Sequence, residues 1–236
     1  MKCVLQNIFY LTSRESQGVF RRQRHCGNIV HEVLEDHVSS SETLDLEKMK
    51  ISFVEYKKTI DPKSEISTEL NEAGIQILED FYDIYSGRIF NVYGKEMSFN
   101  FVLGNYLIIG YIDRVDVTND TVEIVDYKTG KREVAQKDIA TNLQLGIYAL
   151  ATSLAFPGKQ IKGSLHYLRS GRIKSHDYSQ EDLDQVKQRV VEKINLIVND
   201  FNFTPTKNER ICHFCDHAKS GACPTGVARL KRANKG

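Results

Sequence analysis

The stretch GYIDRVDVTNDTVEIVDYKTG, residues 110–130, decides the fold of this chain. Apolar and β-branched residues flank the turn-forming triplet at 118–120, which predicts two antiparallel strands joined by a tight turn. Side chains two apart share one face of a strand, and on each strand we expect an apolar core face that ends in charge. These faces are Leu107, Ile109, Tyr111 and Asp113 on the first strand and Val122, Ile124, Asp126 and Lys128 on the second.

The charged ends of these two faces require an explanation. Two carboxylates and a lysine at the end of a buried face are costly unless they meet a cation or one another. A divalent-metal site satisfies that requirement, and a plain salt bridge between strand ends is the alternative. The spacing alone leaves both interpretations open.

Length and composition are those of a globular protein of one large domain or two small ones, with 236 residues and a net charge of +1. The balanced charge argues neither for nor against nucleic acid, because a basic patch can lie within a balanced total. The apolar runs are too short to span a bilayer, and no signal peptide is recognisable, so we expect a cytoplasmic protein. Because Cys3 lies so close to Met1, the sequence leaves open whether an upstream region belongs to the protein.

Hydrophobic periodicity predicts the remaining elements. We expect a solvated loop over 38–47, and a helix that begins at Ser179, where Asp182 three residues later forms a capping signal. The expected helices are 28 onward, 48–60, 64–85, 136–154 and 179–201, and the further strands are 89–103, 161–169 and 172–178.

Several polar residues stand out along this path. His31 lies at the edge of an apolar helical stripe and is either a core residue or a ligand, and Glu96 on a strand is either a site residue or solvated. Gln144 and Tyr148 are four apart, so their polar ends can point to one place. The basic turn with Lys131 and Arg132 suits a phosphate backbone as well as plain solubility. These residues are Glu96, His31, Gln144, Tyr148, Lys131 and Arg132.

Four motifs in this order resemble the PD-(D/E)XK nuclease superfamily, and within it the RecB-like branch of AddB-type helicase-nucleases and CRISPR-associated nucleases. They are G-x-x-x-H from Gly27 to His31, G-x-x-D-R-x-D over 110–116, D-Y-K-T-G over 126–130 and Q-x-x-x-Y from Gln144 to Tyr148. The likeness spans residues 27–223. It implies an α/β, restriction-endonuclease-like mixed central β-sheet flanked by helices.

The resemblance also implies roles for individual residues. Asp113 and Asp126, with His31 and the backbone carbonyl of Tyr127, would hold Mg²⁺ or Mn²⁺, which prefer such hard ligands. Lys128 would position the attacking water and stabilise the charge of the transition state. Gln144 and Tyr148 would orient the lysine or the nucleic acid, Glu96 would join the catalytic group, and Lys131, Arg132 and Arg114 would contact DNA.

Five cysteines without a secretory signal make a disulfide framework unexpected. Cys212, Cys215 and Cys223 supply three thiolates, one short of a four-coordinate site. Similar nucleases hold a 4Fe-4S cluster with a fourth cysteine near the N-terminus, which would be Cys3 or alternatively Cys26. A Zn²⁺ site completed by a nearby histidine, and three unlinked buried cysteines, are the alternatives. The histidines concerned are His213 and His217.

We therefore expect a nuclease core over 1–203, with an N-terminal helical part over 1–87, and a C-terminal cysteine staple with a basic tail over 204–236. The expected activity is metal-dependent hydrolysis of single-stranded DNA from an end, in DNA repair, recombination or CRISPR adaptation, with a possible helicase or adaptation partner. A non-catalytic DNA-binding module of a helicase-nuclease complex is one alternative. A restriction-type or RNA-directed nuclease is another, because one constellation serves many substrates.

Overall fold

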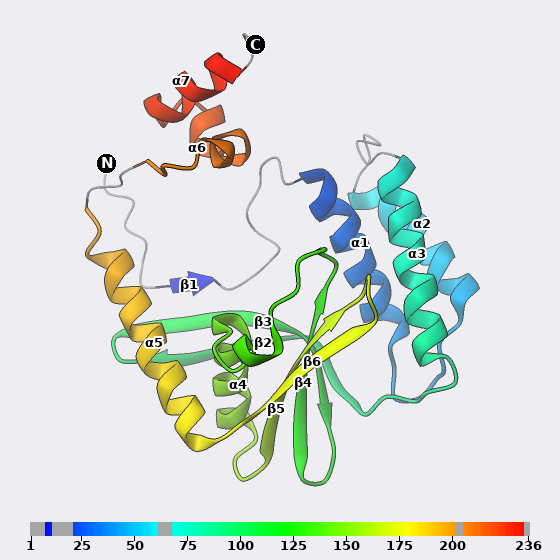
Figure 1. The fold of residues 1–236 in the computed structure, drawn as a ribbon. Helices are drawn as coiled ribbons and strands as arrows, with labels where there is room; N and C mark the ends of the chain where they lie inside the picture. The colour runs from blue at the N-terminus through cyan, green and yellow to red at the C-terminus, as the bar shows by residue number, and fades with distance from the viewer. Residues whose placement is uncertain (1–7, 11–20, 61–67, 202–204, 234–236) are drawn as a thin grey trace.

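The computed structural model describes residues 8–10, 21–60, 68–201 and 205–233, and these form a mixed sheet with helices on both faces (Figure 1). The strands are β1 (Ile8–Tyr10), β2 (Val92–Leu103), β3 (Tyr106–Val117), β4 (Thr121–Lys128), β5 (Gln160–Tyr167) and β6 (Arg172–Tyr178). The helices are α1 (Arg21–His37), α2 (Leu46–Ile60), α3 (Thr68–Tyr85), α4 (Leu143–Ala155), α5 (Gln180–Val198), α6 (Asp216–Lys219) and α7 (Pro224–Ala233), with 3₁₀ turns η1 (Gln136–Asp138) and η2 (Glu209–Phe214).

The six strands are arranged around β3. β2 pairs antiparallel along β3, while β1 pairs parallel with Leu107–Ile109 and β4 pairs antiparallel with Arg114–Val117. β5 continues the sheet parallel to β4, and β6 pairs antiparallel to β5. The sheet thus combines parallel and antiparallel pairs, and the predicted α/β, restriction-endonuclease-like class is confirmed.

Two apolar cores hold the helices against the sheet. α4 and α5 pack on one face over Ile112 and Ile124, and α1, α2 and α3 pack on the other face over Val125 and Tyr127. β4 therefore contributes side chains to both cores, as expected for a central strand with helices on each side.

The predicted hairpin is confirmed, because β3 and β4 pair antiparallel around a turn at residues 118–120. One predicted face is wrong. In β3 the core face contains Ile108 and Ile112, and Tyr111 on the other face is 46% exposed. α4 and α5 cover only the first of these faces along this part of β3, so the face that leads to Asp113 stays partly open.

Most other predicted elements are confirmed, including the capping box of Ser179 and Asp182 that begins α5. The predicted starts of two helices are wrong. α1 begins at Arg21, earlier than the predicted residue 28. α4 begins at Leu143 instead of residue 136, because the Asn142 side chain accepts a hydrogen bond from the Leu145 amide and caps the helix there.

The C-terminal elements η2, α6 and α7 pack on one another and lie apart from the sheet in Figure 1. The division of the chain at residues 203 and 204 stays a prediction. None of the described helices is both long and apolar enough to span a membrane.

Candidate nuclease site

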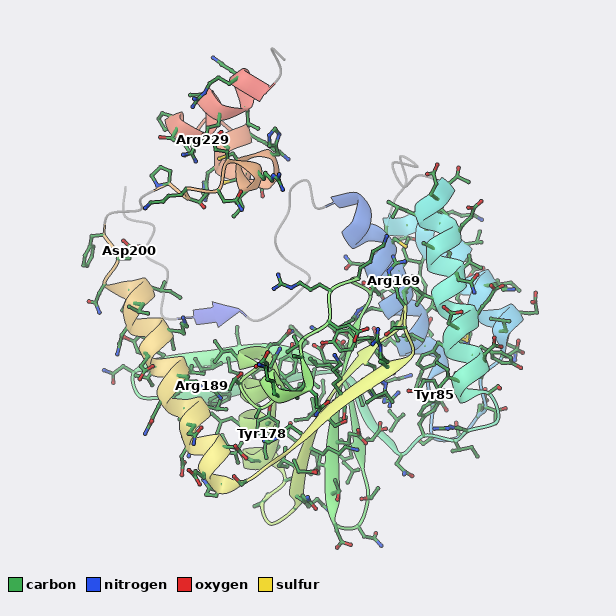
Figure 2. All side chains as sticks on the ribbon, in the orientation of Figure 1. Tyr85, Arg169, Tyr178, Arg189, Asp200 and Arg229 are labelled. Carbon is green, nitrogen blue, oxygen red and sulfur yellow. The ribbon has the colours of Figure 1, made fainter. Side chains whose placement is uncertain are left out.

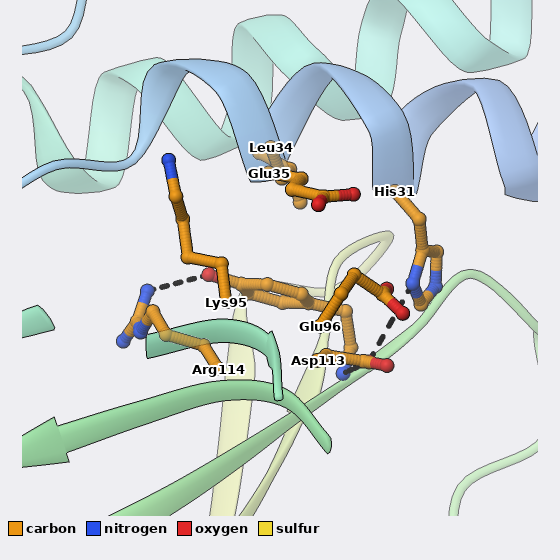
Figure 3. Close-up of a pocket in the computed structure, with 8 residues that line it drawn as sticks. His31, Leu34, Glu35, Lys95, Glu96, Asp113 and Arg114 are labelled. Atoms are coloured by element: carbon orange, nitrogen blue, oxygen red, sulfur yellow. Dashed lines mark hydrogen bonds and ion pairs between the residues drawn. The ribbon is translucent and has the colours of Figure 1, made fainter. Parts of the chain in front are cut away.

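His31 from α1, Glu96 from β2 and Asp113 from β3 meet at one end of the sheet. One ligand atom from each lies within 4.8 Å of the others. The His31 Nδ1 atom is 3.5 Å from Asp113 Oδ2, and Figure 3 shows the imidazole reaching from α1 toward Asp113 beside Glu96. A nitrogen and two carboxylates at this separation form a donor set suited to Mg²⁺ or Mn²⁺.

Glu96 is positioned by an irregularity in β2. Its neighbours pair with Ile112 and Arg114, so Glu96 lies across from Asp113, yet it has a φ of +43°. A non-glycine residue in this left-handed region is strained, and such strain concentrates at functional sites. The sequence offered Glu96 only as an acidic residue on an alternating strand, and the register of β2 against β3 shifts just before it, between Val92 and Gly94.

Asp126 and Lys128 lie at the end of β4. Asp126 is 2% exposed, and its Oδ2 atom is 2.5 Å from Lys128 Nζ. Burial raises the pKa of Asp126 to about 6, the charge of nearby Asp113 adds to this effect, and Lys128 opposes it. A buried carboxyl group with a raised pKa is more easily ionised when a cation binds beside it.

The backbone of Tyr127 links the two strand ends. Its amide donates a 2.8 Å hydrogen bond to Asp113 Oδ2, which fixes the carboxylate between His31 and β4. The role of the Tyr127 carbonyl as a ligand of the cation stays a prediction.

A hydrogen-bonded chain runs from Lys128 into α4. Lys128 Nζ donates to Gln144 Oε1 at 2.9 Å, and Gln144 Nε2 donates to the Tyr148 hydroxyl at 2.8 Å. Tyr148 is buried, which raises the pKa of its hydroxyl. The structure therefore brings Gln144 of the Q-x-x-x-Y motif to Lys128, and Tyr148 to Gln144.

Arg114 was predicted to contact DNA, and its placement corrects that prediction. The residue is 4% exposed, its Nε atom lies 2.9 Å from Asp116 Oδ1, and its Nη1 atom donates to the Tyr127 hydroxyl. The guanidinium also lies over the Phe90 ring. A group enclosed in this way supports the β4 end from behind the site. The D-R-x-D spacing was the only signal that could have revealed the ion pair.

A groove of about 850 Å³ opens beside these residues. One wall comes from α1 and α3, and the other from the end of β4, the loop that follows it and Arg169, two residues after β5. Lys131 lines the groove and Arg132 follows it as an exposed residue, so their predicted contact with DNA remains open. The lining includes Asn28, His31, Leu70, Asp113, Asp126, Lys128, Lys131, Gln144 and Arg169.

The glycine of the G-x-x-x-H motif has a steric role. A Cβ atom on Gly27 would lie 2.9 Å from Thr129 Oγ1, which is closer than side chains tolerate. Gly27 therefore lets α1 approach the loop after Lys128, and that approach carries His31 to the site.

Of the three C-terminal cysteines, Cys212 lies in η2, Cys215 directly before α6 and Cys223 directly before α7. Cys212 is buried, and its Sγ atom accepts a hydrogen bond from Arg229, while Cys223 Sγ accepts one from the Gly226 amide. Cys215 is half-buried. His213 and His217, the histidines of the zinc alternative, are exposed neighbours of these cysteines.

The fourth ligand of a cysteine cluster is less well defined. Cys3 lies outside the described residues. Cys26 is buried between α1 and α3, donates to the Leu70 carbonyl at 3.0 Å, and has a pKa raised by burial. The structure does not bring Cys26 to the C-terminal cysteines.

Comparison with known proteins identifies the superfamily of this chain. Residues 5–224 match the model of the PD-(D/E)XK nuclease superfamily, and the chain belongs to that superfamily. Nucleases of this superfamily typically use Mg²⁺ or Mn²⁺. The RecB-like branch stays a prediction.

Among curated proteins, the chain is similar to Gene 69 protein of Mycobacterium phage L5, with 29% identity over 126 residues, 51% of this chain and 41% of that protein. Gene 69 protein of Mycobacterium phage D29 is 29% identical over 138 residues, 55% of this chain and 47% of that protein. The match thus spans less than half the length of either relative.

Two solved structures are also similar. The crystal structure of SSO0001 has 18% identity and a TM-score of 0.40, covering 86% of this chain and 96% of that one. A proposed exonuclease from Eubacterium rectale has 15% identity and a TM-score of 0.44, covering 83% of this chain and 72% of that one.

Proposed function

We propose that this chain is a Mg²⁺- or Mn²⁺-dependent deoxyribonuclease that hydrolyses single-stranded DNA from an end. The observation that carries the proposal is the convergence of His31, Glu96 and Asp113 within 4.8 Å, next to the Asp126–Lys128 pair. Family membership supports the nuclease chemistry. The single-stranded substrate, the requirement for a free end and the pathway go beyond what family membership supports.

The residues present fit a hard divalent cation. Their donors are carboxylate oxygens and an imidazole nitrogen, and Asp126 is a buried carboxylate whose pKa is raised to about 6 by that burial. When bound, such a cation lowers the pKa of water and neutralises charge on the phosphate. His31, Glu96, Asp113, Asp126 and the Tyr127 carbonyl would hold it.

Lys128 provides the remaining positive charge in this proposal. Its amino group is held between Asp126 Oδ2 and Gln144 Oε1, so it has a fixed direction before DNA arrives. A fixed ammonium beside the scissile phosphate stabilises charge that develops in the transition state, because it needs little reorganisation. Gln144 and Tyr148 act through Lys128 and are positioning residues.

The groove of about 850 Å³ is the place proposed for the DNA strand. Asp113, Asp126 and Lys128 all line this groove, so a strand lying in it would pass the proposed catalytic groups. A role in repair, recombination or CRISPR adaptation follows from the family resemblance.

We also propose that Cys212, Cys215, Cys223 and Cys3 hold a 4Fe-4S cluster that pins the chain ends. Two of the sulfur atoms, on Cys212 and Cys223, accept hydrogen bonds, as ligand sulfurs of such clusters do. The visible absorption of anaerobically purified protein tests this proposal. A colourless protein with stoichiometric zinc would overturn it.

The decisive experiment compares linear and circular single-stranded DNA, with Mn²⁺, Mg²⁺ or a chelator. We expect shortening of the linear strand with either metal, no cleavage with chelator, and an intact circle. Asp113→Ala should abolish cleavage, whereas Asp177→Ala, an exposed carboxylate on β6, should cleave at the wild-type rate.

Three outcomes would contradict the proposal. Absence of hydrolysis by the wild-type protein would favour the non-catalytic DNA-binding module. Undiminished hydrolysis by Asp113→Ala would reject the site assignment. Cutting of the circle would reject the requirement for an end.

A further inference from the structure

Arg169 is a groove residue that the catalytic motifs do not include. β4 and β5 are parallel, so their carboxyl ends meet at the same edge of the sheet, and the Leu168 amide donates to the Lys128 carbonyl at 3.0 Å. Arg169 follows directly and lines the groove with Lys128 and Lys131. Ligands of α/β sheets commonly bind outside the carboxyl ends of such strands.

A short contact fixes the guanidinium of Arg169. Its Nε atom donates to the Thr129 carbonyl at 2.7 Å, which attaches Arg169 to the residue that follows Lys128. The charge of Arg169 also lowers the pKa of Cys26 on α1, against the larger effect of burial, so its field reaches across to the helical wall. Figure 2 shows Arg169 beside α1 at this end of the sheet.

Among the described residues, neither Arg169 nor the exposed Lys131 of the same groove pairs with a carboxylate, in contrast to three other cations near the site. Lys128 pairs with Asp126, Arg114 pairs with Asp116, and Lys174 pairs with Glu133. Within the described residues, Arg169 forms no ion pair with a carboxylate, and its one hydrogen bond uses Nε. The two Nη groups of a guanidinium form a planar fork that matches two oxygens of a phosphate.

We propose that Arg169 binds a phosphate of the DNA strand next to the scissile phosphate, and that Thr129 couples this contact to Lys128. The inference rests on the proposed function, since it names a contact of the same substrate in the same groove. Both a backbone phosphodiester and a terminal phosphate present the required pair of oxygens.

A purely structural role for Arg169 explains less. The loop after β4 is already tied to the sheet, because Val134 donates to the Tyr167 hydroxyl at 2.9 Å and Lys174 donates to the Val134 carbonyl at 2.6 Å. A neutral donor would be enough to hold Thr129. A charge without a carboxylate partner in a half-buried position is costly unless it meets an anion.

The test measures binding of fluorescent single-stranded DNA by the full chain in chelator, as a function of salt. The variants are Arg169→Ala, Arg169→Gln, which keeps a donor without charge, and Arg169→Lys, which keeps the charge. Arg88→Ala on the exposed surface is the matched control. One lost phosphate contact should reduce the slope of log affinity against log salt by about 0.7 and weaken binding about tenfold.

We expect that loss for Arg169→Ala and Arg169→Gln, a wild-type slope for Arg169→Lys, and no change for Arg88→Ala. In the presence of metal, Arg169→Ala should raise KM more than it lowers kcat. A wild-type slope and affinity for Arg169→Ala would overturn the inference, and so would equal behaviour of the Gln and Lys variants.

Strands with a 5′-phosphate, a 3′-phosphate or hydroxyl ends separate the two sources of phosphate. A loss confined to one phosphorylated strand assigns Arg169 to that terminus, and an equal loss on all strands assigns it to a backbone phosphodiester. If the wild-type protein binds DNA but cleaves none, the proposed function fails while these slopes still test Arg169.

Discussion

The carboxylate site (His31, Glu96, Asp113, Asp126 and Lys128) and the cysteine segment (residues 205–233) are both candidate metal centres, yet they are built differently. The carboxylate site takes its residues from four elements of the packed core, and β4 at its centre is covered on both faces. In the cysteine segment, among the residues whose exposure the structure describes, the buried ones are Cys212, Ala218 and Gly226.

The two candidate metal centres differ in what fixes their geometry. Apolar packing holds the residues of the carboxylate site in place, so the site has its geometry before a cation binds. The cysteine segment buries too little apolar surface to fold on that basis, and small units of this kind depend on a metal or a crosslink. Metal binding is then part of the folding free energy of the segment.

Lys128→Ala should have the largest effect on the carboxylate site. We expect a fall in kcat of about a thousandfold or more, equivalent to about 4 kcal/mol, because a fixed charge is lost at the phosphate. Thermal unfolding is measured in parallel, because the change leaves the buried Asp126 without its cation, and turnover is compared at a temperature where the variant is folded. Lys137→Ala, at an exposed position, is the control, and a Lys128→Ala enzyme with near-normal turnover would contradict the assignment.

Arg114→Ala tests whether packing behind the site matters to the fold. Removing one partner of a buried ion pair leaves Asp116 without its cation, and such changes cost about 3–5 kcal/mol. Urea unfolding measures the loss. The double variant Arg114→Leu, Asp116→Leu should recover part of it, because no buried charge remains. A loss below about 1 kcal/mol in the single variant would show that the pair contributes little.

Titration of His166 should make the unfolding free energy of the core, and not that of the cysteine segment, depend on pH. Burial lowers its pKa to about 3, and the charges of Arg114 and Lys162 add to the effect. The unfolded chain, with a histidine pKa of about 6.5, binds more protons between these values, so stability falls as pH drops below about 6.5. At pH 5 this group should cost about 2 kcal/mol.

The control for this pH dependence is His166→Gln, which cannot titrate. The difference in unfolding free energy between wild type and variant should change by that amount between pH 8 and pH 5. A difference that is constant with pH would show that His166 does not titrate as its burial implies.

Cys212→Ser should have the smallest effect on the sheet. The cysteine segment packs on itself, so the unfolding free energy of the core should change by less than about 0.5 kcal/mol, as for independent sites. Hydrogen exchange in α7 should instead become fast. Protection that is unchanged in α7, or a large loss of core stability, would remove the contrast between the two centres.

Much of the carboxylate site was predictable from sequence. The alternation around residues 118–120 gives the hairpin, and motif spacing gives Asp113, Asp126 and Lys128. The position of Gln144 beside Lys128 follows once a helix is known to pack on the end of β4. Local pattern suffices here because each of these residues lies within or at the end of a regular strand or helix.

Three features could not be predicted, for physical reasons. The φ of Glu96 depends on the β2–β3 register, which no local signal specifies. The buried state of Arg114 depends on the rings and the carboxylate that enclose it in three dimensions. The place of Arg169 depends on the parallel pairing of β4 and β5, which are separated by α4 in the sequence.

That parallel pairing of β4 and β5 determines when the site can form during synthesis on the ribosome. β4 has one edge on β3 and the other on β5, and β5 follows it only after α4 has been made. Because a chain emerges from its N-terminus onward, Asp126 and Lys128 leave the ribosome before the strand that completes their surroundings. The groups that are proposed to cut DNA therefore reach their complete surroundings only after β5 has been made.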